Sequence, residues 1–165
     1  MQSLVETSNF DFLKSGFPDL AEIGEFAENY VFSDPNGSLY KIGVMGEIIV
    51  EQIMKFEYLR CPYDATQYNK IEILKNEGLL PENIVSILHS IRMRRNHAVH
   101  ERENSVTLAK GLLKKAYELC NWFMEVYGSW DYKALPYSEP QQKEKAEDYQ
   151  EIFEEQNQRI DALEK

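Results

Sequence analysis

The residue types best suited to chemistry are concentrated in one short stretch, residues 81–102. An arginine can hold a phosphate, an asparagine can position it, and a histidine can move a proton near neutral pH. Arg95, Asn96 and His100 supply these three types close together. They could cleave RNA without a metal, by helping a 2′-hydroxyl attack its own phosphodiester. The stretch holds all three histidines and four of the arginines: His89, His97, His100, Arg92, Arg94, Arg95 and Arg102.

The same residues also have a structural interpretation. Histidine and arginine side chains near the C-terminal end of a helix interact favourably with its last carbonyls and its dipole, and Asn96 could satisfy a neighbouring loop. His97 and His100 have the spacing of helical metal ligands, but no acid in the same helix completes a standard zinc set with them and His89. We therefore predict no metal site and no cofactor in this chain.

A helix that begins near Pro81 must position these side chains, because proline followed by an acid suits a first helical turn. On this helix Arg92, Asn96 and His100 form one polar stripe, since they are spaced by four residues. Arg95 instead points close to the apolar face, so either the helix ends there or Arg95 reaches a buried acid on another helix. The apolar face consists of Ile84, Ile87, Leu88, Ile91 and Ala98.

Four further helices are predicted from the spacing of apolar residues. Asp34 and Ser105 are candidate N-caps, and Gly78 is a candidate residue for a helix end. Gly43 and Gly46 would weaken the second helix unless another helix packs closely against them. The predicted ranges are 18–30, 36–59, 66–77 and 105–127.

No stretch alternates apolar and polar residues as a strand would, so the chain is predicted to be all-α. We expect a bundle of about five helices within residues 1–128, a linker over 129–140 and an acidic helix over 141–165. The acidic helix carries apolar residues at coiled-coil spacing, which makes it a candidate homodimer seam or a joint to further domains. The seam residues are Tyr149, Phe153, Gln156, Ile160 and Leu163.

Charge is unevenly distributed along the chain, whose net charge is −10. Residues 86–115 contain seven Lys or Arg and two acids, whereas residues 138–165 contain four Lys or Arg and nine acids. A net negative field does not favour nucleic acid, but the basic stretch could still contact DNA or a partner protein. The predicted contact residues are Arg92, Arg94, Arg102, Lys110, Lys114 and Lys115.

The remaining features predict a cytoplasmic protein that does not enter a membrane. The N-terminus lacks the basic start and apolar run of a signal peptide. No stretch approaches the roughly 18 apolar residues of a membrane span. Cys61 and Cys120 fit no metal or redox spacing, and neither requires an oxidising compartment.

The run RNHAVH, residues 95–100, resembles the R-x4–6-H motif of the HEPN superfamily, in which asparagine follows the arginine. This resemblance implies a small α-helical bundle. Many HEPN domains are metal-independent ribonucleases that build an active site from two copies of the motif across a dimer. Carried over, Arg95, Asn96 and His100 would be the catalytic residues.

A longer resemblance covers about residues 9–128, including the run ILKNEGLLPENIVSILHSIRMRRNHAVHE and a helix ending in NWFMEVYG. These stretches look like the helical domain of unknown function near the N-terminus of some type I restriction enzyme R (HsdR) subunits. The motif of that family is similar to L-R-x-x-x-N-x-A-V-H, which assigns the arginine role to Arg92, in register with Asn96 and His100. The family is grouped with HEPN-like folds, so the two resemblances are compatible.

The longer resemblance implies a parent protein that is an ATP-dependent DNA translocase and endonuclease, with ATP and Mg²⁺ as its cofactors. The chain contains neither helicase motifs nor a recognisable PD-(D/E)xK nuclease core. We therefore expect a non-catalytic module that contacts the rest of the R subunit, the methyltransferase and specificity subunits, or DNA. The alternative is a dimeric, metal-independent ribonuclease of the HEPN type.

Overall fold

The all-α prediction is confirmed by the computed structural model, which describes residues 7–100, 104–129, 131–133, 136–142 and 154–159. The described part contains a short 3-10 helix, η1 (Asp11–Leu13), five longer helices and a helical turn at 154–159. None of the described helices is long and apolar enough to cross a membrane. The longer helices are α1 (Pro18–Asn29), α2 (Pro35–Phe56), α3 (Gln67–Asn76), α4 (Glu82–His100) and α5 (Val106–Tyr127).

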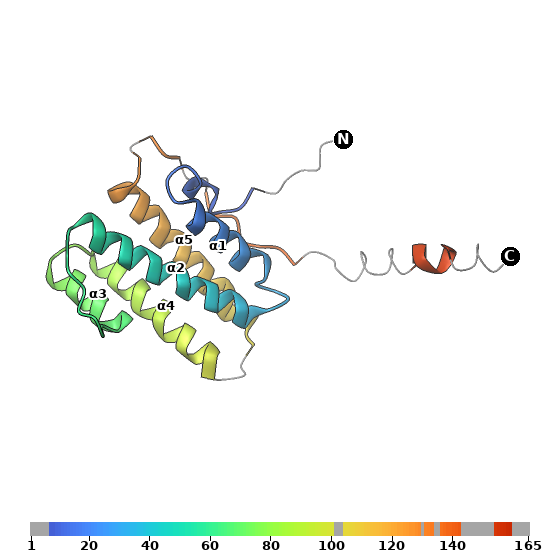
Figure 1. Ribbon diagram of the computed structural model, residues 1–165. Coiled ribbons are helices and arrows are strands. Elements are labelled where there is room, and N and C mark those ends of the chain that lie inside the picture. Colours follow the sequence, from blue (N-terminus) through green and yellow to red (C-terminus); the bar gives the residue numbers. More distant parts are fainter. Residues whose placement is uncertain (1–6, 101–103, 130, 134–135, 143–153, 160–165) are drawn as a thin grey trace.

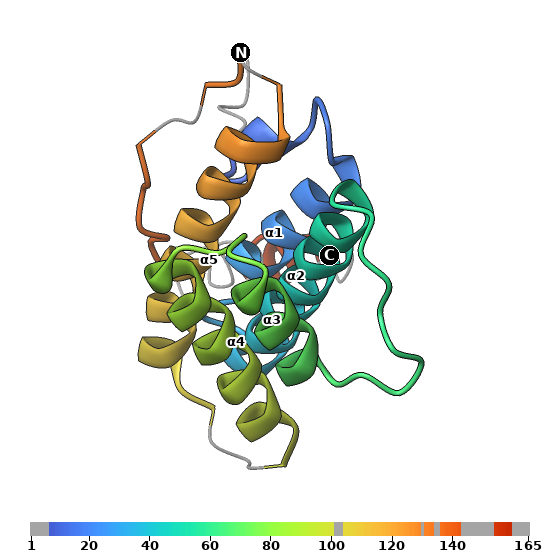
Figure 2. The same ribbon diagram turned by 90° about the vertical axis from the view of Figure 1, so that its left-hand side faces the viewer.

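Helix α2 lies at the centre of the bundle and packs against each of the other four long helices (Figure 1). Helices α4 and α5 also pack against each other, and α3 lies beside α4 (Figure 2). The fully buried residues of α2 include Ile42, Met45, Ile49 and Ile53. The predicted apolar face of α4 is confirmed: Ala98 is partly buried, and the buried members are Ile84, Ile87, Leu88 and Ile91.

Side-chain caps determine where three of the helices begin. The carboxylate of Asp34 accepts a hydrogen bond from Gly37 N at 3.0 Å, as predicted for the start of α2. The hydroxyl of Ser105 accepts one from Leu108 N at 3.2 Å at the start of α5, and Thr66 caps α3 in the same way. Each such cap stabilises its helix by about 1 kcal/mol.

Helix α2 ends at Phe56, three residues earlier than the sequence predicts. Tyr58 has a left-handed backbone with a φ of 54°, and the amides of Tyr58 and Leu59 donate back to carbonyls in the last turn of α2. This pair of hydrogen bonds is a Schellman motif, in which the left-handed residue is usually glycine. The same motif ends α3, where the left-handed residue is Gly78 with a φ of 72°. A left-handed tyrosine costs about 1–2 kcal/mol, so local sequence rules do not predict a helix end there.

Helices α2 and α4 approach each other closely at the two central glycines of α2. A Cβ on Gly43 would lie 2.7 Å from Cγ and 2.9 Å from Cβ of Arg95. A Cβ on Gly46 would lie 3.3 Å from Cγ2 of Ile91. A closely packed neighbouring helix therefore accounts for both glycines. Gly111 in α5 differs, because no described atom lies within 4 Å of the position its Cβ would take.

The described residues that directly follow α5 run along that helix. Residues 131–133 and 136–140, which we call the strap, lie within the predicted linker. Residues 141–142 are not helical, although the sequence predicts that the acidic helix begins at residue 141. The contacts of the strap show that it runs back towards the N-terminal end of α5. These contacts are Tyr132 with Asn121, Tyr137 with Tyr117, and Glu139 with Lys110.

Asn9 ties the strap to the beginning of the bundle. Its Nδ2 donates to Ser138 O at 2.7 Å, and Ser138 N donates to its Oδ1 at 2.8 Å. Glu28 of α1 accepts a hydrogen bond from Asn9 N at 3.1 Å, and burial raises the pKa of this carboxyl above its usual range. We call these three residues the clasp; it joins the first and last described parts of the bundle.

Alanine should have opposite effects at the two kinds of glycine. Gly43→Ala should lower the free energy of unfolding by about 1–3 kcal/mol, because the new methyl group meets the stem of Arg95. Gly111→Ala should raise it by about 0.5–1 kcal/mol, because alanine loses less entropy in a helix and has open space around it. Urea unfolding of both variants beside the wild type measures these changes. Equal effects would contradict the difference in packing.

Candidate functional site

Helix α4 turns the predicted site residues to two sides. Each residue of a helix turns by about 100°, so residues two apart point in nearly opposite directions. The side chains that face α2 and α3 are Arg92, Arg95 and Asn96, and those that face α5 are Arg94 and His97.

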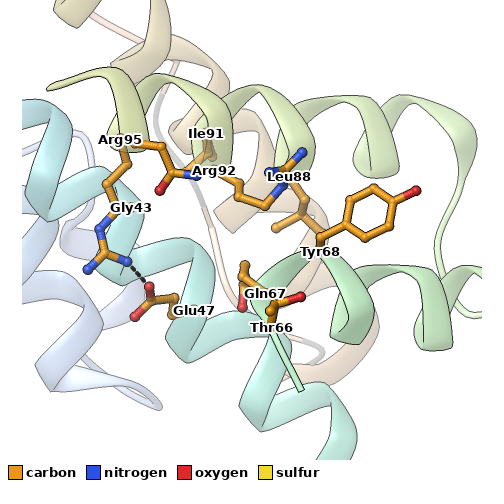
Figure 3. Close-up of a pocket in the computed structure, with 10 residues that line it drawn as sticks. Gly43, Glu47, Thr66, Gln67, Tyr68, Leu88, Ile91, Arg92 and Arg95 are labelled. Carbon is orange, nitrogen blue, oxygen red and sulfur yellow. Dashed lines mark ion pairs between the residues drawn. The ribbon is translucent and has the colours of Figure 1, made fainter. Parts of the chain in front are cut away.

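A hollow of about 370 Å³ lies where α4 meets α2 and the start of α3 (Figure 3). We call it the arginine hollow, because two arginines form its α4 wall. Figure 3 shows Glu47 of α2 and Tyr68 of α3 on the facing walls. The residues that matter for its chemistry are Arg92, Arg95, Asn96, Gly43, Glu47 and Tyr68.

Arg95 crosses from α4 to α2 over the bare backbone of Gly43. Its guanidinium forms an ion pair with the carboxylate of Glu47 and lies 4.8 Å from the ring centroid of Tyr40. Arg95 therefore reaches an acid on another helix, which was one of the two predicted explanations. The acid is less buried than expected, since the side chain of Glu47 is 40% exposed and that of Arg95 is 22% exposed. An ion pair this exposed contributes about 1 kcal/mol or less.

Arg92 is held on the α3 side by a chain of polar contacts. Its Nε donates to Nδ1 of His89 at 3.4 Å, an arrangement that leaves the ring proton on Nε2. Nε2 of His89 then donates to Oε1 of Glu72 in α3 at 3.0 Å. The guanidinium carbon of Arg92 lies 5.2 Å from the ring centroid of Tyr68. Both candidate arginines thus have partners inside the molecule.

Asn96 is exposed and lines the arginine hollow. The structure therefore brings Arg92, Arg95 and Asn96 together on one wall. His100 ends α4, but its side chain lies outside the described residues, as does the whole of Arg102. Three of the four residues proposed for ribonuclease chemistry are thus placed in one hollow.

Two more hollows lie on the other side of α4, over α5. The α4–α5 hollow, of about 350 Å³, is lined by Arg94, His97 and Lys115 among others. The strap hollow, of about 470 Å³, lies between α5 and the strap and includes Lys110 and Lys114. The predicted contact residues are therefore divided between the two sides of α4. Arg92 lies on the α3 side, and the others that the structure describes lie on the α5 side, namely Arg94, Lys110, Lys114 and Lys115.

The described part of the chain contains no group of three or more His, Cys, Asp or Glu placed to hold a metal ion. Both cysteines are unpaired; Cys61 is exposed and Cys120 is buried. Burial raises the pKa of the Cys120 thiol, which makes it a core residue rather than a nucleophile.

Sequence reasoning does not single out Glu47, Tyr40 and Tyr68, which hold the two arginines. A signal exists for Glu47, because it follows Gly43 by four residues and so lies on the same face of α2. The missing side chain at Gly43 leaves space for the stem of an arginine from another helix, and the carboxylate of Glu47 can pair with its guanidinium. The two tyrosines give no comparable signal, because aromatic residues at helical spacing are typical of a core.

Residues 27–155 match the family described as Domain of unknown function (DUF4145). The chain belongs to this family. It is also 30% identical over 120 residues to the Type I restriction enzyme EcoKI endonuclease subunit of Escherichia coli (strain K12). The match covers 73% of this chain and 10% of the relative, so the chain spans about a tenth of that protein's length. No solved structure matches the chain significantly.

These matches confirm the predicted relationship to the R subunits of type I restriction enzymes. Helices α2 to α5 and all three hollows lie within the matched residues of the DUF4145 family. The arginine hollow is therefore a feature of the DUF4145 part of this chain.

Removing Arg95 should destabilise the fold, whereas removing its neighbour should not. Arg95→Ala should lower the free energy of unfolding by about 1–2 kcal/mol, because it removes the stem packed on Gly43 and leaves Glu47 unpaired. Arg94→Ala, at an exposed position on the same helix, should change it by about 0.5 kcal/mol or less. Urea unfolding compares the two variants. A larger loss in Arg94→Ala would show that Arg95 does not hold α2 to α4.

Proposed function

We propose that the chain is a non-catalytic helical interaction module of a type I restriction R subunit, serving subunit assembly or DNA contact. The observation that carries this proposal is the engagement of Arg95 by both Glu47 and Tyr40. An arginine that binds a substrate phosphate must present its N–H donors to that phosphate. Here a carboxylate of the same chain already pairs with one terminal nitrogen of the guanidinium, and a ring of the same chain lies beside it.

The contacts of Arg92 support the same function. Its Nε is bound to His89 and its guanidinium lies over Tyr68, so the arginine of the R-subunit motif joins α4 to α3. In this proposal the motif holds α2, α3 and α4 together. The surface that remains for a partner lies on the other side of α4.

The likeness to the EcoKI endonuclease subunit supports the choice of parent. ATP-dependent translocation and Mg²⁺-dependent cleavage would then belong to other domains of the R subunit. This chain would contribute contacts with those domains, with the methyltransferase and specificity subunits, or with DNA. We favour contact with protein over contact with DNA, because the chain as a whole has a net charge of −10 and so repels DNA. The exposed basic residues suited to such contact are Arg94, Lys114 and Lys115.

The proposed function predicts that the full chain binds either a methyltransferase–specificity complex or duplex DNA. Replacing Arg94 and Lys115 by Glu should weaken that binding about tenfold or more, because the contact surface loses two cations and gains two repulsive charges. Fluorescence anisotropy with each labelled partner, from about 50 to 200 mM salt, measures the affinity; a steep fall with salt marks the DNA version.

A matched control for this experiment is the double change Lys55→Glu and Arg60→Glu. Both residues are exposed, and the change in net charge is the same. This control should bind like the wild type. Absence of binding to either partner at low salt would contradict the proposed function.

A ribonuclease is the second candidate because of one observation. Asn96 is exposed in the arginine hollow beside Arg92 and Arg95. A HEPN-type site would combine Asn96 and one of these arginines with His100, and would complete itself with a second copy of the motif across a dimer. Such an enzyme would first have to release Arg95 from Glu47.

The two candidates predict different fates for RNA. If the chain is an interaction module, mixed-sequence RNA incubated with the wild type in EDTA should stay intact, because both arginines are engaged. Gel electrophoresis of the RNA measures cleavage, and His100→Ala and His97→Ala form a matched pair. Cleavage that is lost in His100→Ala but kept in His97→Ala would establish a metal-independent ribonuclease and overturn the non-catalytic proposal.

A further inference from the structure

Gly111 is the one mid-helix glycine of the described residues with no side chain packed over it. Gly24 lies under Phe10, and the two central glycines of α2 lie under side chains of α4. Nothing described comes within 4 Å of the position a Cβ on Gly111 would take. Glycine weakens the middle of a helix relative to alanine, and no contact in the described bundle offsets that weakness.

Gly111 lies in the middle of a depression that crosses α5. The α4–α5 hollow and the strap hollow share two residues, Thr107 and Gly111. Together these hollows form one surface, which we call the trough. Met93, 52% exposed, and the buried Leu112 are apolar members of it. Because Gly111 has no side chain, another helix could come close to the backbone of α5 at this point.

The trough is basic on both sides of Gly111. Arg94 and Lys115 line one end, and Lys110 and Lys114 line the other. Of these four, only Lys110 has an acidic partner within 4 Å among the described residues. An occupant of the trough should therefore be a helix that carries both acidic and apolar residues.

The chain itself supplies a segment of this chemistry. Glu139 of the strap already pairs with Lys110 at 2.9 Å in the strap hollow. The residues that follow belong to the stretch 138–165, with nine acids against four Lys or Arg. The described turn at 154–159 is helical, and all six of its residues are exposed. None of the ion pairs among the described residues involves Glu154 or Glu155; in Figure 1 the turn is drawn as a short red helix.

We infer that the trough binds the acidic C-terminal segment, residues 143–165, of a second copy of this chain, with that segment forming a helix. Glu154 and Glu155 would pair with the cations around Gly111. Phe153 and Ile160 are seven residues apart in the sequence, so on a helix they share one face. That face would pack on apolar residues of the trough, Met93 and Leu112. Exchange of the two helices would be reciprocal and would close a two-fold dimer. This inference rests on the proposed interaction function and names a partner for its basic surface.

The test measures the mass of the full chain by light scattering, over a range of protein concentration. The wild type should reach twice the 19.3 kDa of one chain. Lys114→Glu with Lys115→Glu should raise the dimer dissociation constant about tenfold or more, because two attractive contacts become repulsive. Lys55→Glu with Arg60→Glu, which makes the same change in net charge at exposed residues elsewhere, should leave the dimer unchanged.

A charge exchange identifies the helix that occupies the trough. Glu154→Lys with Glu155→Lys should weaken the dimer in the same way. Mixing this variant with Lys114→Glu/Lys115→Glu should restore a dimer, because each defective surface then meets a complementary one. Gly111→Leu should raise the thermal midpoint of the chain at low protein concentration, since leucine favours a helix, yet should abolish the dimer by filling the trough.

Several results would overturn this inference. One is a mass of one chain at every concentration, and another is a dimer that survives the changes at Lys114 and Lys115. Binding of duplex DNA that requires these lysines, while the chain stays monomeric, would assign the trough to nucleic acid. A monomer could also protect the backbone amides of the trough from hydrogen exchange. If Glu154→Lys with Glu155→Lys removed that protection, the trough would be assigned to the C-terminal segment of the same chain. None of these outcomes would refute the interaction module, which is tested separately by binding to the two proposed partners and by the RNA cleavage assay.

Discussion

The close approach of α2 and α4 at Gly43 and Gly46 is the constraint on which the rest of the structure depends. With no side chains at these two positions, the backbone of α2 can lie directly under α4. Arg95 can then lie flat across α2 and reach Glu47, and Ile91 can enter the core. Because α2 also contacts α1, α3 and α5, a wider separation from α4 would disturb the packing of α2 against those helices as well.

The motif residues can be understood from this constraint. Arginine, asparagine and histidine at these spacings are chemically competent for RNA cleavage, and the same residues are competent to join helices. What distinguishes the two uses is the partner of each arginine. Arg95 is paired with a carboxylate of α2, and Arg92 is linked through His89 to Glu72 of α3. Two helices are therefore attached to α4 through polar contacts around a hollow, beside the apolar core.

Local features of the fold could be predicted from the sequence because they depend on neighbouring residues. Asp34 and Ser105 cap helices as expected, and Gly78 ends one. The end of α2 could not be predicted, because Tyr58 adopts a backbone conformation that tyrosine rarely takes. The partner of Arg95 could be predicted only as an unspecified acid, since its identity depends on how α2 and α4 are aligned. The opposite directions of Arg92 and Arg94 follow from helix geometry alone.

The clasp has a mechanical consequence. It places Asn9 and Ser138 within hydrogen-bond distance of each other, so a longer polypeptide could enter and leave the bundle at nearly one point. A pulling force between two such connections would load the hydrogen bonds of the clasp and the strap first. The contact between α2 and α4 would carry little of that force. The bundle would then behave as a side branch of the polypeptide, which stays folded while the parts on either side of it move.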